Sequence, residues 1–364
     1  MDNNAEKIFI TKAFMPKIEE YNYYVSKIFE SKILTNQGSL LKELEVKLKD
    51  YLQVDNFHYV SNGTIALQIA LKALDIEEGE IITTPFSYVA TTSSILWEKC
   101  IPVFVDIEDD SFTINADKIE EKITEKTKAI MAVNVFGYVC NFEKIQQIAD
   151  KYNLKVIYDS AHCFAGKYKG KSILDYGDIS TCSFHATKLF HTIEGGCCVV
   201  KDKTVSDKLE LIKRFGHNHD NHIMLGINAK NSEFHSAMGL ANLKYVDFIL
   251  NERKKITELY DSLLKDVVKR PKQQDNLEYN YAYYPVVFKS EDELLRVFAE
   301  LNKNNIYPRR YFYPSLNTLP YLKTQQSCPI SEDISLKIAC LPLYVGLDLS
   351  KVEEICEIVK RVIG

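Results

Sequence analysis

Two residues that follow strand-like segments could take part in covalent chemistry. Lys188 comes just after residues 178–185 (DISTCSFH), and apolar residues flank it. Burial removes hydration from an amine, lowers its pKa and favours the neutral, nucleophilic form that makes a Schiff base. Asp159 ends the apolar segment 155–159, where a carboxylate is costly to bury unless a cation or hydrogen-bond donors face it. Taken singly, the lysine could equally be a solvated charge and the aspartate a helix cap.

A short polar segment at an expected helix start could bind an anion. The residues Ser61-Asn62-Gly63-Thr64 lie between an apolar segment and a helical pattern over residues 64–74. Glycine lets a bound group approach the backbone, Thr64 offers a hydroxyl, and free amides at a helix start attract negative charge. An ordinary helix cap explains the same residues, so both interpretations stay open.

Two further patterns suggest other chemistries. Residues 165–172 (AGKYKGKS) fit a loose form of the phosphate-binding loop of ATPases, but such a loop leaves a strand directly and enters a helix. Here the preceding strand ends at Asp159 and a poor helix follows, which favours a lysine-rich surface turn. The histidines of residues 216–222 (GHNHDNH) lack both helical spacing and cysteine partners, so we expect no metal site.

The elements that must position these residues follow a repeated pattern. From about residue 38 to 200, short β-branched segments alternate with helical periods, which is typical of β-α units around a parallel sheet. We predict helices over residues 40–51, 64–74, 89–99, 117–123 and 141–152. We predict strands over residues 80–84, 102–106, 129–135, 155–159, 179–184 and 196–200.

The rest of the chain predicts a second unit. A helical stretch is predicted over residues 233–264. It is followed by a predicted strand (282–288), a helix (291–302), a proline-containing loop (308–314) and a terminal helix (349–362). The 364 residues also exceed what one core usually holds. We therefore predict an N-terminal segment with a large α/β domain over 1–245, and a long linking helix with a small α+β domain over 246–364.

Composition and charge exclude several classes of protein. The chain is 46% hydrophobic and 26% charged, as folded globular proteins are. Its net charge is −5 without long blocks of one sign, so nucleic acid and anionic membranes are not expected partners. We predict neither a membrane-spanning helix nor a secretory signal. The nine cysteines include no C-x-x-C pair, which favours a location in the reducing cytoplasm. A small-molecule substrate is the expectation that remains.

Several short motifs occur in a fixed order along the chain. They are LTNQG (34–38), SNGT (61–64), TPFSYVAT (84–91), PVFVD (102–106), DSAH (159–162), SFHATK (183–188), EGG (194–196) and GINAK (226–230). In this order they resemble the sugar aminotransferases of the DegT/DnrJ/EryC1/StrS family, from about Leu34 to the C-terminus. The resemblance implies fold type I of the pyridoxal 5'-phosphate (PLP)-dependent transferases, like aspartate aminotransferase: α/β, with a large, mostly parallel sheet domain and a small α+β C-terminal domain.

The resemblance assigns the two strand-end residues to catalysis with PLP. It implies that Lys188 forms a Schiff base with the cofactor and then moves the proton between substrate and cofactor carbons. It implies that Asp159 faces the ring nitrogen and keeps it protonated, so that the ring accepts electrons. Tyr88 matches the residue that stacks on the ring, and His162 the residue that contacts the ring hydroxyl.

The resemblance also implies a phosphate cup shared between subunits. Gly63, Thr64 and Ser183 match positions that bind the cofactor phosphate. Asn228 matches a residue that reaches this cup from a second subunit, which implies a homodimer with shared active sites.

The substrates also come from the resemblance. Lysine at position 188, where some members carry histidine and dehydrate, implies amino transfer from L-glutamate to a nucleotide-linked ketosugar. Residues 309–314 (RRYFYP) together with 226–230 resemble the subgroup that converts dTDP-4-keto-6-deoxyglucose to dTDP-4-amino-4,6-dideoxyglucose, as in O-antigen and lipopolysaccharide biosynthesis. The alternatives are a 3-ketosugar or UDP-sugar aminotransferase of the same family, or a regulator that keeps the fold without catalysis.

The residues that would contact the substrates are less sharply defined. We assign His185, Lys230, Arg309 and Tyr313 to substrate binding, the first three as candidates for the pyrophosphate or the donor carboxylate. Two positions depart from the family pattern: Lys230 stands where many members carry arginine, and Asn134 where histidine is frequent. Substrate contacts near these positions therefore need a structure.

Overall fold

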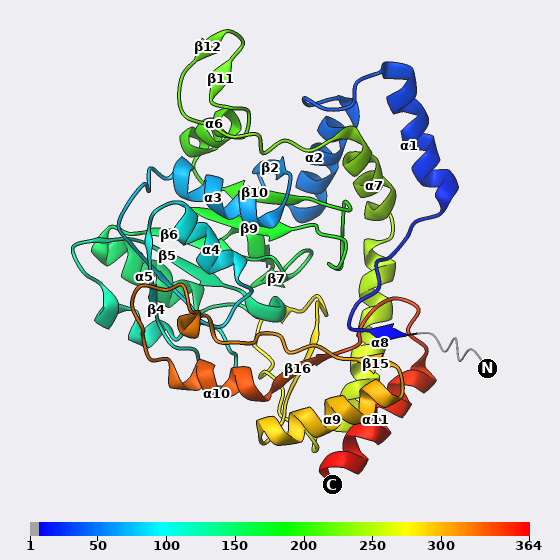
Figure 1. Cartoon of the computed structure of the whole chain (residues 1–364). Helices are drawn as coiled ribbons and strands as arrows, with labels where there is room; N and C mark the ends of the chain where they lie inside the picture. The colour runs from blue at the N-terminus through cyan, green and yellow to red at the C-terminus, as the bar shows by residue number, and fades with distance from the viewer. Residues whose placement is uncertain (1–6) are drawn as a thin grey trace.

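The computed structural model describes residues 7–364, and its centre is a seven-stranded sheet (Figure 1). The strand order is β2-β10-β9-β6-β5-β3-β4. The strands are β2 (Asn56–Val60), β3 (Glu80–Thr83), β4 (Ile101–Phe104), β5 (Thr127–Val133), β6 (Lys155–Asp159), β9 (Ile179–Ser183) and β10 (Gly196–Val200). Neighbours from β9 through β4 pair in parallel, whereas β10 is antiparallel to both β9 and β2. The predicted fold class, α/β with a large and mostly parallel sheet, is confirmed.

Helices cover both faces of this sheet because its strands are apolar on both faces. Adjacent residues of a strand point to opposite sides: Ile81 packs in a cluster with helix α3, and Ile82 in another with helix α5. The helices of this part are α2 (Ser39–Leu52), α3 (Gly63–Ala73), α4 (Ala90–Trp97), α5 (Phe142–Tyr152), α6 (Lys203–Ile212) and α7 (Glu233–Leu243). Polar side chains fix where several of them begin; Asn62 caps α3 by accepting from the amide of Ile65 at 2.9 Å.

The C-terminal part has a hydrophobic cluster of its own. Its elements are α8 (Val246–Leu264), β14 (Tyr284–Val287), α9 (Glu291–Lys303), β15 (Ile306–Tyr307), α10 (Pro329–Lys337), β16 (Ile338–Leu341) and α11 (Leu349–Ile363). β1 (Ile8–Phe9) crosses over to pair in parallel with β15, as Figure 1 shows beside α8. The N-terminal strand thus packs with the C-terminal part, and the predicted division at residues 245 and 246 stays a prediction.

Some local predictions were wrong. The expected helix at residues 117–123 forms two short 3-10 turns, Ala116–Lys118 and Glu120–Lys122, because Asn115 caps a single turn and Ile119 already turns into the core. The stretch 233–264 is two helices, α7 and α8, separated at residues 244–245. Helix α1 (Ile18–Ser31), which packs on α7, was not predicted.

Two hairpins account for the other motifs considered in the sequence. Residues 165–172 contain β7 (Lys167–Tyr168) and β8 (Lys171–Ser172), joined by a tight turn. Both turn residues, at 169 and 170, have positive φ, which is typical of the type I′ turns that join hairpin strands. This segment therefore lacks the strand-to-helix geometry of a phosphate-binding loop. The histidine-rich segment forms β11 (His217–Asn218) and β12 (Asn221–His222), and Figure 1 shows this hairpin projecting from the sheet domain.

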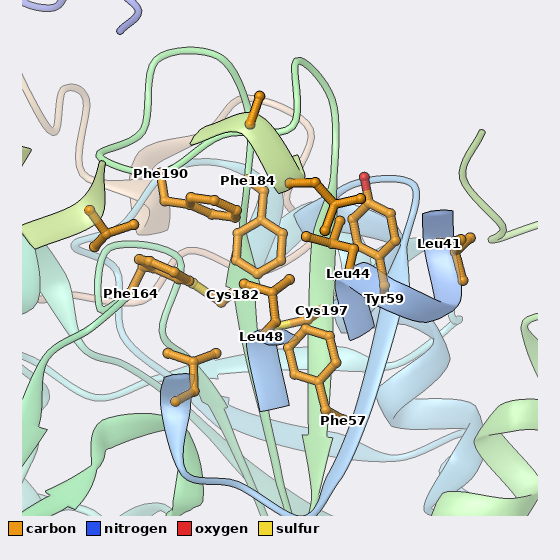
Figure 2. Packing of buried hydrophobic residues seen from close by; sticks show 14 of the residues in the cluster. Leu41, Leu44, Leu48, Phe57, Tyr59, Phe164, Cys182, Phe184, Phe190 and Cys197 are labelled. Carbon is orange, nitrogen blue, oxygen red and sulfur yellow. The ribbon is translucent and has the colours of Figure 1, made fainter. Parts of the chain in front are cut away.

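An aromatic core supports the loop that carries Lys188. Figure 2 shows Phe164, Phe184 and Phe190 packed together beside leucines of α2. The ring centroids of Phe164 and Phe190 are 4.4 Å apart, and those of Phe184 and Phe190 are 5.2 Å apart. Since Phe184 and Phe190 bracket the turn that carries Lys188, this core fixes where the lysine leaves the sheet.

No helix of residues 7–364 is long and apolar enough to cross a membrane.

Candidate active site

A cavity of about 570 Å³ opens where the carboxyl ends of β5, β6 and β9 meet the start of α3. Most residues that the sequence assigned to the site line it: Gly63, Thr64, Tyr88, Asp159, His162, Ser183, His185, Lys188 and Arg309. Asn228, Lys230 and Tyr313 do not. Ligands of α/β proteins bind at this edge of the sheet, so the cavity is the candidate active site.

Lys188 projects into the cavity from a short turn after β9. Its backbone amide donates to the carbonyl of His185 at 2.8 Å, which closes the turn. Burial lowers the pKa of Lys188, while the phenol of Tyr311 and the carboxylate of Asp159 act in the opposite direction. The ammonium nitrogen lies 5.7 Å from the ring centroid of Tyr283. Burial therefore makes the neutral amine that covalent chemistry requires easier to form than in an exposed lysine.

Asp159 ends β6, and its side chain faces the cavity with only 6% of the residue exposed. Burial raises the pKa of this carboxyl group, and two donors and Lys188 lower it. The hydroxyl of Thr91 donates to Oδ2 at 2.7 Å, and the amide of Ala161 donates to Oδ1 at 3.2 Å. Because Thr91 uses its hydrogen on Asp159, the hydroxyl of Ser87, 2.8 Å away, must donate to Thr91. This chain of donors supports the charged carboxylate.

His162 is held as a neutral ring in the same wall. Its Nδ1 accepts from the amide of Phe136 at 3.0 Å, so the hydrogen of the neutral ring is on Nε2. Burial and the nearby charge of Lys188 hold the pKa of His162 well below its usual value. The ring of Phe312 lies nearly parallel at 5.8 Å between centroids. His162 can therefore donate a hydrogen bond without carrying charge.

The start of α3 lies at the wall of the cavity and has groups that could bind an anion. Thr64 is exposed there, and Ser183 approaches so closely that a Cβ added to Gly63 would lie 3.1 Å from the Cβ of Ser183. Gly196 is more tightly constrained, because an added Cβ would lie 2.8 Å from the amide nitrogen of Gly63. Glycines thus let the helix end sit directly on β9 and β10. The positive end of the helix and two hydroxyls can hold a phosphate there.

The C-terminal part supplies another wall of the cavity. Arg309 and the aromatic residues Tyr283, Tyr311 and Phe312 line it, and the guanidinium of Arg309 lies 4.8 Å from the Tyr311 ring centroid. Tyr313 instead packs outside the cavity, where the guanidinium of Arg310 lies 3.5 Å from its ring centroid.

Residues 215–230, which include the β11–β12 hairpin and are called the arm below, carry Asn228 and Lys230. Neither of these two residues lines the cavity of its own chain. Asn228 is exposed at the base of the projecting hairpin and accepts from the ammonium of Lys230 at 2.7 Å. The carbonyl of Ala229 accepts from the amide of Ser61 at 2.9 Å, which ties the arm to the loop before α3. The rings of His217 and His222 are 5.4 Å apart on the hairpin, and no cluster of three His, Cys, Asp or Glu side chains within residues 7–364 could hold a metal ion.

Several residues of the site were missed in the sequence. Ser87 and Thr91 lie within the motif at 84–91, but only the fold shows that Thr91 reaches Asp159. The other cavity residues without an assigned role include Asn62, Asn134, Glu194, Tyr283, Tyr311 and Phe312. The aromatic tract at 309–314 was a usable signal for two of them, whereas Tyr283 had none.

Comparisons with known proteins agree with this geometry. The model of the DegT/DnrJ/EryC1/StrS aminotransferase family matches residues 17–360. A dTDP-4-amino-4,6-dideoxy-D-glucose transaminase of Shigella dysenteriae is 38% identical, covering 98% of this chain and 99% of that protein. A GDP-perosamine synthase of Escherichia coli O157:H7 is 34% identical, covering 92% and 93%. The PseC aminotransferase of Helicobacter pylori, involved in pseudaminic acid biosynthesis, matches with a TM-score of 0.90 and 26% identity, covering 98% and 99%.

The donor groups of the cavity fit PLP. One space is surrounded by a lysine whose pKa is lowered by burial, a buried carboxylate, and a helix start with two hydroxyls. The aldehyde, the ring nitrogen and the phosphate of PLP require groups of these three kinds. The fold and this site define a PLP-dependent aminotransferase. The chain belongs to the DegT/DnrJ/EryC1/StrS aminotransferase family.

Proposed function

We propose that this enzyme transfers the amino group of L-glutamate to the keto carbon of a nucleotide-linked deoxysugar. The proposed reaction converts dTDP-4-keto-6-deoxy-D-glucose to dTDP-4-amino-4,6-dideoxy-D-glucose. The observation that carries amino transfer is that Lys188 and Asp159 face one cavity with an anion cup at its end. The 38% identity to a transaminase named for this product supports the choice of sugar.

The residues of this chain have distinct tasks in the proposal. PLP, when bound, supplies an electron sink for the electron pair released at the substrate carbon. Lys188 Nζ accepts the proton from that substrate carbon, as a general base, and then donates it as a general acid to complete the proton transfer. Asp159 would keep the proton on the ring nitrogen of bound PLP, and His162 would donate a hydrogen bond to its ring hydroxyl. Tyr88 lines the cavity and would cover one face of the ring.

The phosphate and the substrates occupy the two ends of the cavity in this proposal. Gly63, Thr64 and Ser183 hold the cofactor phosphate. Arg309 lies where an anionic part of the donor or the nucleotide could bind. His185 lies beside the carboxylate of Glu194, so it is less suited to bind an anion. Tyr313 packs outside the cavity, so a contact with substrate would require a movement of its loop.

A spectroscopic test separates the amino-transfer mechanism from its rivals. We expect the purified enzyme to be yellow, to change its absorbance with L-glutamate, and to keep a borohydride-reduced cofactor adduct on a peptide containing Lys188. The Lys188→Ala variant should be colourless and inactive, whereas Lys171→Ala, on the β7–β8 hairpin, should behave as the parent. A fully active Lys188→Ala enzyme would refute the mechanism, and an ATPase would respond to Lys171 instead. A regulator without catalysis would show no change with glutamate.

A panel of ketosugars tests the acceptor. The enzyme, loaded with amino groups from glutamate, is incubated with dTDP-, UDP- and GDP-linked 3-keto and 4-keto sugars, and the new amine is located by NMR. We expect the dTDP-linked 4-keto sugar to react fastest. Preference for a 3-keto or UDP-linked sugar would support the alternative within the same family.

We also propose a homodimer in which each active site takes Asn228 and Lys230 from the partner subunit. Both residues lie outside the cavity of their own chain. Their arm also exposes apolar side chains: Phe215 (50%), Ile223 (56%), Leu225 (83%) and Ile227 (42%). Exposed apolar groups of this extent favour a covered surface. All nine cysteines are free and buried, which supports a cytoplasmic location as part of the proposal.

Mixing two inactive variants tests the sharing of sites. If sites are shared, a mixed dimer of Lys188→Ala and Asn228→Ala chains contains one site with both residues intact. Co-expression should then restore up to half of the parent activity per mixed dimer. If each chain uses its own Asn228, no site in the mixed dimer is intact and activity stays low.

A further inference from the structure

Glu194 is a second acidic residue of the cavity, and the proposed mechanism does not use it. Within residues 7–364, Asp159 and Glu194 are the acidic residues that line the cavity. Asp159 is buried and bonded to protein donors, whereas the side chain of Glu194 is 53% exposed. A carboxylate that remains open in a binding cavity is available to a ligand.

The backbone of Glu194 is firmly placed at the start of β10. Its carbonyl accepts from the hydroxyl of Thr192 at 2.8 Å and from the side-chain amide of Asn231 at 2.9 Å. The next carbonyl, of Gly195, accepts from the amide of Phe184 at 2.8 Å. The side chain therefore starts from a fixed backbone position and lies beside His185, a residue of the turn that carries Lys188.

The imidazole of His185 lies beside the carboxylate of Glu194. The Nδ1 of His185 accepts from the amide of Thr187 at 3.2 Å, so the hydrogen of the neutral ring is on Nε2. That Nε2 faces Oε1 of Glu194 at 3.5 Å. No protein donor within the described residues bonds the other oxygen, Oε2, which leaves it as an acceptor for a ligand.

Charge restricts which part of a substrate this acceptor can face. A carboxylate repels the carboxylates of L-glutamate and the pyrophosphate of a nucleotide sugar. The donor's amine must reach Lys188, so it is committed elsewhere. The groups that remain are the neutral hydroxyls of the sugar ring, which donate strong hydrogen bonds to a carboxylate.

We propose that Glu194, which lies beside His185 in the cavity, accepts hydrogen bonds from ring hydroxyls of the ketosugar and determines specificity in the second half-reaction. The inference rests on the proposed function, because it requires a sugar acceptor. It predicts that Glu194 matters for the ketosugar and not for L-glutamate.

Measuring the two half-reactions separately tests this proposal. Glu194→Gln keeps the shape and removes the charge, so kcat/KM for the ketosugar should fall about tenfold, since hydrogen bonds to charged groups are stronger than neutral ones. The rate of the spectral change with L-glutamate should stay within about twofold of the parent, because contacts with sugar hydroxyls do not occur in this half-reaction. Glu121→Gln, on an exposed turn outside the cavity, is the matched control and should change neither rate.

A deoxysugar substrate identifies the contact directly. If Glu194 binds one ring hydroxyl, a ketosugar lacking that hydroxyl should lose the same factor with the parent enzyme and little more with Glu194→Gln. Equal losses in both half-reactions would show that Glu194 only positions the Lys188 turn, and unchanged ketosugar kinetics would show no role; either result overturns the proposal. A parent enzyme that fails to react with glutamate would instead refute the proposed function.

Discussion

The hydroxyl of Thr91 should control the charge of Asp159. Burial raises the pKa of this carboxyl group, and the 2.7 Å hydrogen bond from Thr91 is the largest influence that lowers it. In Thr91→Val a methyl group replaces the hydroxyl, so the buried carboxylate loses a donor. A hydrogen bond to a charged group contributes about 1.5–3 kcal/mol. Since one pH unit corresponds to about 1.4 kcal/mol, the expected displacement is about one to two units.

The direction of the change follows from which form is active. Removing a donor destabilises the charged form, so Asp159 takes up a proton at higher pH than in the parent. Its contribution requires the carboxylate and is therefore present at high pH and lost as pH falls. The rate of the glutamate half-reaction is followed by absorbance across the acid range. In Thr91→Val this rate should begin to fall at a higher pH than in the parent, while the maximal rate at high pH stays nearly unchanged.

The neighbouring residue supplies a matched control. Thr92 is buried, and its hydroxyl has no hydrogen-bond partner in the described structure, so Thr92→Val makes the same chemical change without touching Asp159. We expect Thr92→Val to keep the parent pH profile, and Thr91→Ser to restore it. An acid limb that stays in place in Thr91→Val, with the protein still folded, would refute this account of Asp159.

Three further substitutions test how the fold supports the site. Glu233 accepts from the amides of Leu40 and Leu41 at 2.8 and 2.9 Å, so Glu233→Ala should lower the free energy of unfolding by about 2–4 kcal/mol, measured in denaturant. Asp106 accepts from two amides of the first turn of α10, and Asp106→Ala should cost about 1–3 kcal/mol and increase amide exchange in α10. Gly196→Ala should cost about 1–3 kcal/mol through overpacking against the start of α3, and should weaken PLP binding in an absorbance titration; unchanged binding would contradict the close approach described above.

The sequence predicts best what adjacent residues decide. Strand β6 begins and ends where its apolar pattern predicts, and Asp159 follows from that end. The broken helix at residues 244–245 could not be read locally, because helical patterns continue on both sides and tertiary packing sets the break. Thr91 lies 68 residues from Asp159, so their bond depends on how α4 docks against the sheet. Contacts of this kind carry no local signal.

Burial acts on the two central side chains in a way that should link cofactor binding to stability. It raises the pKa of Asp159 and lowers that of Lys188, so it shifts both groups toward their neutral forms. A protonated ring nitrogen beside Asp159 would compensate the cost of burying the carboxylate. A covalent bond to Lys188 would likewise remove the cost of burying the charged form of the amine. Binding of PLP should therefore stabilise the folded enzyme, as any ligand specific for the native state does. This gain should shrink in Asp159→Asn, whose neutral side chain has no charge to compensate. A thermal shift with PLP as large as that of the parent would show that the phosphate cup alone provides the binding energy.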